Sequence, residues 1–82
     1  MAVKSRWQQA DDNFRSQIDR LMGMMRTKDK RKIAKEAGLS EYKMYAYYET
    51  PSKMTKCAER QIASVFLRYG VPYNWNWEEA MA

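Results

Sequence analysis

The stretch KRKIAKEAGLSEYKMYAYYE, residues 30–49, determines the fold that this chain of 82 residues is expected to adopt. Its first half carries small and apolar side chains at helical spacing, namely Ile33, Ala34 and Ala37. Gly38 follows, and glycine commonly ends a helix because it adopts positive φ without strain. Ser40 is then a preferred N-cap for a helix over residues 41–49. The sequence therefore predicts two short helices joined by a tight turn at Gly38.

Apolar stripes predict one helix before this pair and one after it. The first, over residues 11–25, is indicated by apolar side chains on one face, which are Phe14, Ile18, Leu21, Met22 and Met25. Thr27 is the expected N-cap of the second helix. Pro51 is expected to open the last helix, because proline blocks the preceding helix and is tolerated at a first helical position. The apolar face of that last helix consists of Met54, Ala58, Ile62, Val65, Phe66 and Tyr69.

The expected fold class is all-α, a small domain of four to five helices, because no strand-like alternation interrupts these stripes. Gly70 is expected to close the last helix. One common core is predicted, and its central members are Ile33, Leu39, Met44, Ile62 and Phe66.

The twenty residues that begin at Lys30 also meet the constraints of a helix-turn-helix. That motif needs a small residue where its helices approach, a turn residue tolerant of positive φ, and apolar residues at fixed inward positions. Suitable residues stand at each constrained place, and they are Ile33, Ala34, Ala37, Gly38, Leu39, Met44 and Tyr47. The segment IAKEAGLS, residues 33–40, resembles the phage repressor and Cro-like helix-turn-helix family.

A second segment carries the same resemblance. The run ASVFLRYGVP, residues 63–72, is similar to the family's last core helix and to the Gly-Val that follows it. The resemblance covers about residues 14–71 and implies a lambda repressor-like fold. It also implies a sequence-specific, duplex DNA-binding transcriptional regulator of phage or prophage type. Phage activators of the CII type share the motif, so repressor and activator roles both stay open.

The resemblance implies that the helix over residues 41–49 lies in the major groove. If Met44 and Tyr47 pack inward, the outward side chains are expected to contact bases, and these are Glu41, Tyr42, Tyr45, Ala46 and Glu49. Phosphate contacts are expected from Lys30, Lys32, Lys35, Ser40, Lys43 and Lys53. Four tyrosines are unusual for a recognition helix of this family, and the two glutamates would repel a phosphate backbone.

The charge distribution also favours a polyanionic partner. The formal net charge is +5, and residues 26–36 hold six basic and two acidic side chains. A second basic group follows Pro51 and consists of Lys53, Lys56 and Arg60. Basic clusters neutralise phosphates and release counterions, although a solvated helix face carries the same signature.

The residue inventory argues against catalysis, metal binding and a membrane span. The chain has no histidine and a single cysteine, Cys57, so we expect no enzyme, no metal, no cofactor and no small-molecule substrate. Cys57 is expected to be a small buried thiol, because it falls among Met54, Ala58 and Ile62. No apolar window is long enough for a membrane, and the first residues lack a signal peptide, so a cytoplasmic location is expected.

Three segments are expected along the chain: an N-terminal extension over residues 1–10, the helix-turn-helix domain over residues 11–72, and an aromatic tail over residues 73–82. Tyr73, Trp75 and Trp77 in the tail either cap the core or join two copies. We favour pairing into a homodimer, because a single small helix-turn-helix unit buries little DNA surface and usually binds as one of a pair.

Two rival functions stay open. In the first, the outward aromatic face and the tail bind a protein. The chain is then a phage adaptor or inhibitor that has a helix-turn-helix scaffold but does not bind DNA. In the second, the chain is an excisionase-like architectural protein that bends DNA. Such proteins usually carry a hairpin wing, for which the sequence offers no pattern.

Overall fold

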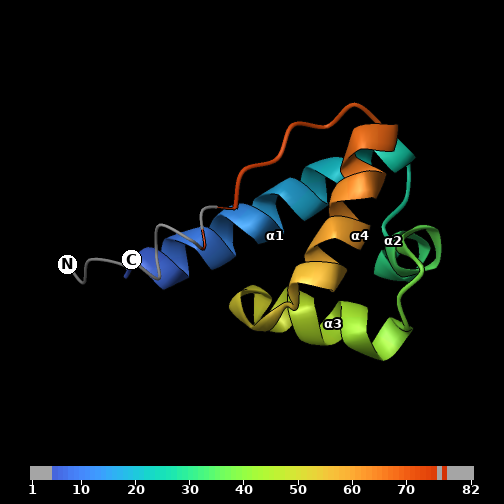
Figure 1. The fold of residues 1–82 in the computed structure, drawn as a ribbon. Helices are drawn as coiled ribbons and strands as arrows, with labels where there is room; N and C mark the ends of the chain where they lie inside the picture. The colour runs from blue at the N-terminus through green and yellow to red at the C-terminus, as the bar shows by residue number, and fades with distance from the viewer. Residues whose placement is uncertain (1–4, 76, 78–82) are drawn as a thin grey trace.

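Four α-helices make up most of residues 5–75 and 77, which the computed structural model describes. They are α1 (Arg6–Met25), α2 (Lys30–Ala37), α3 (Glu41–Glu49) and α4 (Lys56–Arg68), with a short 3-10 helix, η1 (Pro51–Lys53), between α3 and α4 (Figure 1). No strand occurs in this part of the chain. The expected all-helical class with four α-helices is therefore confirmed.

The start of α1 lies earlier than the sequence pattern indicated. The helix begins at Arg6, not at Asp11, so part of the expected N-terminal extension is helical. Ser5 and Gln8 form a reciprocal cap, in which the Ser5 amide donates to Gln8 Oε1 at 3.0 Å and the Gln8 amide donates to Ser5 Oγ at 3.2 Å. The apolar stripe missed this turn because Ala10 is the only buried residue among residues 5–10.

Asp29, and not Thr27, caps the start of α2. The Asp29 carboxylate accepts from the Arg31 amide at 3.0 Å. The Thr27 hydroxyl instead accepts from the Asp29 amide at 3.0 Å, so it shapes the preceding turn. At the other end of α2, Gly38 adopts the expected left-handed conformation with a φ of 77°. The Leu39 amide then bonds back to the Ala34 carbonyl at 2.9 Å and closes the helix end.

The connection between α3 and α4 corrects a second boundary. Pro51 opens η1 and is buried, whereas α4 begins at Lys56. Thr55 has extended backbone angles, and its hydroxyl accepts from the Ala58 amide at 3.1 Å. A threonine that caps in this way starts a new helix, so the chain cannot run as one helix from Pro51.

The core gathers side chains from all four helices. Its fully buried members include Phe14, Ile18, Leu21, Ile33, Met44, Ile62, Val65 and Phe66. The expectation of one common core is thus confirmed for four of its five central residues, while Leu39 is half-buried and packs against the cluster. Cys57 is exposed, contrary to the sequence prediction. It lies in the first turn of α4 beside the inward residue Ala58, and neighbours on a helix point about 100° apart.

The chain after α4 returns along α1 and completes the core, as the orange-to-red segment in Figure 1 shows. Two hydrogen bonds tie it to α1: the Asn74 amide donates to Gln17 Oε1 at 2.8 Å, and Gln17 Nε2 donates to the Asn74 carbonyl at 2.9 Å. The Trp75 ring lies 5.2 Å from the ring of Phe14 and 5.6 Å from that of Phe66.

The buried tryptophans correct the role that we favoured for the tail. Trp75 and Trp77 are only 3% and 9% exposed, so both cover the core of their own chain and offer little surface to a second copy. Trp77 also directs its indole nitrogen toward Asp11 at 3.4 Å. Tyr73 is 40% exposed, although its ring lies 5.7 Å from that of Phe66 and 5.0 Å from that of Trp75. The homodimer itself stays a prediction.

None of the helices within residues 5–75 and 77 has both the length and the apolar character that crossing a membrane requires.

We predict that Trp75→Ala destabilises the domain by about 3–5 kcal/mol, because it empties the site against Phe14 and Phe66. Urea unfolding followed by circular dichroism measures the loss. Trp7→Ala is the matched control, because Trp7 lies near the start of α1 and is 38% exposed. Its loss should stay within about 1 kcal/mol. Equal small losses for both variants would contradict the role assigned to the tail.

Candidate nucleic-acid interface

The outward face of α3 is exposed, as the sequence predicted. All five expected base-contacting residues are exposed, namely Glu41, Tyr42, Tyr45, Ala46 and Glu49. Tyr42 and Tyr45 are 82% and 46% exposed. Met44 is fully buried, and Tyr47, which was expected to pack inward, is half-buried. The face of α3 that points away from the core therefore consists of tyrosines, glutamates, Ala46 and Lys43.

A basic hollow adjoins the first turn of α3. Its volume is about 420 Å³, and its lining consists of Arg31, Lys32, Lys35, Leu39, Ser40 and Glu41. The hollow thus brings together three of the expected phosphate-contacting residues, Lys32, Lys35 and Ser40. We refer to this feature as the basic hollow. Its three cations all come from α2, and the remaining lining comes from the turn and from the start of α3.

Arg31 belongs to the basic hollow, but it is not among the phosphate-contacting residues that the sequence predicts. It stands four residues before Lys35 on α2, and residues at that spacing share one helix face. Helical periodicity from Lys35 is therefore a signal that would have identified Arg31. Its side chain is 57% exposed in spite of its ion pair.

Asp29 holds Arg31 with a two-pronged ion pair. Arg31 Nε lies 2.9 Å from both carboxylate oxygens of Asp29, and Arg31 Nη2 lies 2.8 Å from Asp29 Oδ2. The hydrogen bonds from Arg31 lower the pKa of Asp29 below its usual value. The pKa of Arg31 is raised, first by its hydrogen bond to Asp29 and then by the negative charges of Asp29 and Glu41. Arg31 therefore stands at the junction between the basic hollow and the outward face of α3.

The remaining predicted phosphate contacts are distributed differently. Lys43 on α3 and Lys53 in η1 are exposed. Ser40 caps α3, because its hydroxyl accepts from the Lys43 amide at 3.1 Å. The Lys30 side chain packs against the protein, because its ammonium lies 4.2 Å from the centre of the Tyr48 ring. The structure thus brings Lys32 and Lys35 together and separates Lys30 from them.

Other polar groups serve the packing between helices. The Tyr69 hydroxyl donates to the Glu36 carboxylate at 2.9 Å, and Arg68 pairs with Glu36 at 3.0 Å, which ties the end of α4 to α2. The bond to Glu36 raises the pKa of the Tyr69 phenol above its usual value. Among the described residues, no three potential metal-ligating side chains of the His, Cys, Asp and Glu types form a group.

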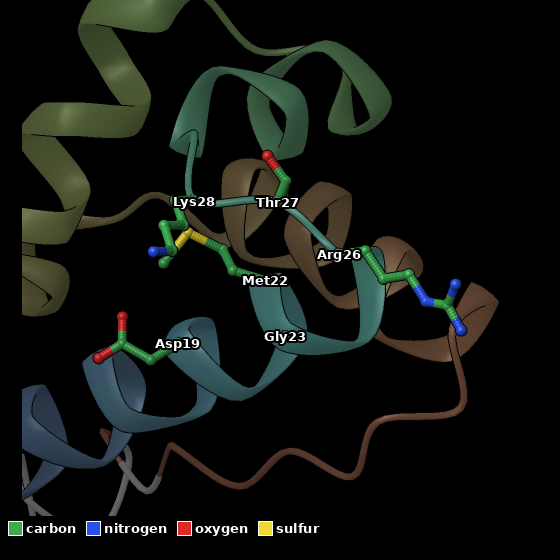
Figure 2. A pocket seen from close by; sticks show the side chains of 6 residues that line it. All are labelled: Asp19, Met22, Gly23, Arg26, Thr27 and Lys28. Atoms are coloured by element: carbon green, nitrogen blue, oxygen red, sulfur yellow. The ribbon is translucent and has the colours of Figure 1, made fainter.

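A second hollow lies at the C-terminal end of α1, and none of the predicted contact residues is among those that line it. Its volume is about 500 Å³, and it is lined by Asp19, Met22, Gly23, Arg26, Thr27 and Lys28 (Figure 2). Asp19 and Lys28 reach toward it from α1 and from the turn before α2, whereas the Arg26 side chain points away (Figure 2). Arg26 ends α1 in the left-handed conformation with a φ of 57°.

No protein-family description, curated protein sequence or solved structure matches this chain significantly.

We predict that Arg31→Gln raises the pKa of Asp29 back toward its usual value, because the variant removes the main hydrogen-bond donor to the carboxylate. A folded-state pKa below the unfolded value adds stability above the unfolded pKa, and this contribution is lost as the pH falls through the folded pKa. The carboxyl ¹³C shift of Asp29 over an acid titration measures the change. Lys35→Gln, which removes a charge from the same helix, should leave the pKa of Asp29 unchanged. Identical titrations in Arg31→Gln and the parent would contradict the ion pair.

Proposed function

We propose that this chain binds duplex DNA, with α2, residues 38–40 and α3 acting as a helix-turn-helix and with α3 in the major groove. The observation that carries the proposal is the pairing of an exposed helix face with cations beside it. Five outward side chains of α3 are exposed, and the basic hollow lies at the first turn of the same helix. A major groove about 12 Å wide admits one α-helix, so the exposed face of α3 would meet base edges.

The positions of the cations support docking along both sides of such a groove. Arg31, Lys32 and Lys35 lie at the N-terminal end of α3, and Lys53 in η1 follows its C-terminal end. Phosphates line both edges of a groove, so cations at both ends of a helix that lies in it can each meet a strand. Such contacts position the protein and supply most of its affinity, but they carry no sequence information.

The outward residues of α3 are suited to reading bases. Glu41 and Glu49 are acceptors that fit the amino group of cytosine, and Ala46 is small enough to touch a thymine methyl group. Tyr45 stands midway along the helix, and its hydroxyl can donate or accept. Within the proposal, the chain is a sequence-specific transcriptional regulator of phage or prophage type. It would bind as a homodimer on two half-sites about one helical turn apart.

Selection of bound duplexes from a random pool tests the proposal directly. A regulator should enrich one motif, and a dimer should enrich two half-sites related by a two-fold axis. The conserved positions of that motif define the cognate duplex for the experiments below. Recovery of an unenriched pool at low salt would overturn the proposal of sequence-specific binding.

We predict that two kinds of substitution affect binding differently. Lys35→Ala or Lys53→Ala should weaken binding to cognate and random duplexes alike and lower the salt slope by about one unit each. Tyr45→Ala should mainly reduce the preference for the cognate duplex, by about 1–3 kcal/mol. Titrations of each variant on both duplexes at several salt concentrations measure both quantities. If a lysine variant changes the preference for the cognate duplex and Tyr45→Ala does not, another face of the protein reads the DNA.

Asp29→Asn should tighten DNA binding. Asparagine caps a helix as well as aspartate does, so α2 keeps its N-cap while Arg31 loses its anionic partner. The freed guanidinium and the removal of a negative charge should increase affinity about two- to fivefold on cognate and random duplexes, with a steeper salt slope. Glu59→Gln on α4 removes an equal charge from a residue outside the predicted contact set and serves as the control. Weaker binding by Asp29→Asn would place Arg31 outside the interface.

A second candidate function is that of a phage adaptor or inhibitor that binds a protein through the outward face of α3. The observation in its favour is the 82% exposure of the Tyr42 ring, because exposed aromatic rings are typical of protein interfaces. A mobility-shift assay at low salt separates the two functions. An adaptor should bind neither specific nor random duplex beyond weak charge attraction.

A further inference from the structure

The C-terminal end of α3 is held by a side chain from α1. Arg15 Nη1 donates to the Tyr48 carbonyl at 3.3 Å and to the Glu49 carbonyl at 3.1 Å. Its Nη2 pairs with Asp12 at 3.0 Å, which orients the guanidinium from the same helix. Arg15 of α1 thus binds two carbonyls at the end of α3 that lie 33 and 34 residues further along the chain.

These bonds supply what α3 lacks in its own sequence. The last carbonyls of a helix have no partner within it, and they form the negative end of the helix dipole. A basic residue in the last turn usually compensates, but the last turn of α3 contains none. A helix of nine residues is also too short to be stable by itself. Arg15 therefore satisfies carbonyls and neutralises the dipole from outside the helix.

A second contact holds the same end of α3. The Tyr48 hydroxyl donates to Asp19 at 3.1 Å, and Asp19 stands one helical turn after Arg15 on α1. Burial, together with the charge of Asp19, raises the pKa of Tyr48, so its hydroxyl keeps the proton that it donates. Lys30 from α2 covers the ring of Tyr48 at 4.2 Å. The last turn of α3 is therefore held by side chains from both preceding helices.

We propose that Arg15 and Asp19 are positioning residues, which hold the C-terminal end of α3 and thereby set the angle at which its outward face is presented. The inference rests on the proposed function for what that face reads. Neither residue is assigned a contact with DNA, and both act through α3. We refer to their contacts with Tyr48 and Glu49 as the α1 clamp.

The need for such a clamp follows from the packing of α3. Met44 is the only buried residue of α3, and Ser40 secures the N-terminal end alone. The C-terminal end has no buried residue of its own, and apart from the clamp it is anchored by half-buried Tyr48 and by the buried Pro51 that follows the helix. Glu49 lies at that end and Tyr45 lies next to Met44, so the reach of Glu49 into a groove depends on the clamp more strongly than that of Tyr45.

The first experiment needs no DNA. Arg15→Gln keeps a polar side chain but removes the charge and the two-pronged contact. Hydrogen exchange followed by NMR should then become several times faster at the Thr50 amide, which bonds to the Ala46 carbonyl at 2.9 Å. The amides of α4 should keep their protection. Arg20→Gln on α1 removes an equal charge from an exposed position and should leave the exchange of α3 unchanged.

The second experiment compares affinities for cognate and random duplexes. Arg15→Gln should lower their ratio about tenfold, as when one base contact is misplaced, while the salt slope stays the same. Arg15→Lys, which keeps the charge and can reach one carbonyl, should restore part of the ratio. Tyr48→Phe keeps the ring under Lys30 and removes only the bond to Asp19, so it should give a smaller loss in a folded protein. Arg20→Gln should leave the ratio unchanged.

The outcomes separate the clamp from the proposed function. Unchanged exchange at Thr50 in Arg15→Gln would overturn the clamp whether or not the chain binds DNA. A salt slope lower by about one unit with an unchanged ratio would make Arg15 a phosphate contact and would equally overturn its positioning role. Faster exchange at Thr50 in a chain that selects no duplex would support the clamp and reject the proposed function.

Discussion

Met44 is the one fully buried side chain of α3, and the rest of the molecule is organised around that constraint. Tyr47 and Tyr48 are half-buried, and the other six residues of the helix stay exposed for other contacts. The helix also gains little stability from apolar burial, so its ends must be secured separately. Ser40 caps one end, Arg15 and Asp19 hold the other, and the left-handed Gly38 sets the turn that leads into it. Exposure of the face and restraint of the ends are thus two consequences of one packing arrangement.

The small size of the domain explains the course of the C-terminal segment. A domain this short buries only about 60% of the surface that its unfolded chain exposes, so each large apolar side chain matters. Trp75 and Trp77 cover Phe14 at ring distances of 5.2 and 5.5 Å. Tryptophan supplies much apolar area, but the Trp75 indole nitrogen is buried without a hydrogen-bond partner among the described residues. Both rings thus add buried apolar area to a small core.

Apolar stripes at the helical period, which include Phe14, Ile33 and Ile62, were sufficient to predict α1, α2 and α4. The signals for α3 were instead the turn residue Gly38 and the capping residue Ser40. Boundaries were harder where two suitable caps compete. Thr27 and Asp29 are both good capping residues, and the bond from the Asp29 amide to the Thr27 hydroxyl leaves Asp29 as the cap. The prediction that Cys57 is buried is wrong because it assumes a helix that starts at Pro51, whereas Thr55 begins a new helix.

The candidate site was predictable on α3 and less so around it. Once Met44 was assigned to the core, helical geometry determined which neighbours face outward. The contacts between distant segments had no local signal: Arg15 meets Glu49 across 34 residues of sequence. Lys30 illustrates the same difficulty, because a basic run suggests solvent-facing charges, whereas its ammonium lies against Tyr48. A charge pattern in the sequence identifies which basic residues could contact a partner. Tertiary packing determines which of them stay exposed in the folded protein.

The placement of the acids bears on how selective the proposed interface would be. The cations of the basic hollow come from α2, while Glu41 and Glu49 stand on the exposed face of α3. A carboxylate beside a phosphate backbone opposes binding everywhere, and that penalty is offset only where a cytosine amino group can donate to it. Asp29 acts in the same sense, because it holds Arg31 in an ion pair that a phosphate would have to replace. Under the proposed function, the neighbouring elements supply attraction to any duplex. The recognition helix then rejects sequences that leave its acids without a donor, so its specificity derives as much from repulsion as from contact.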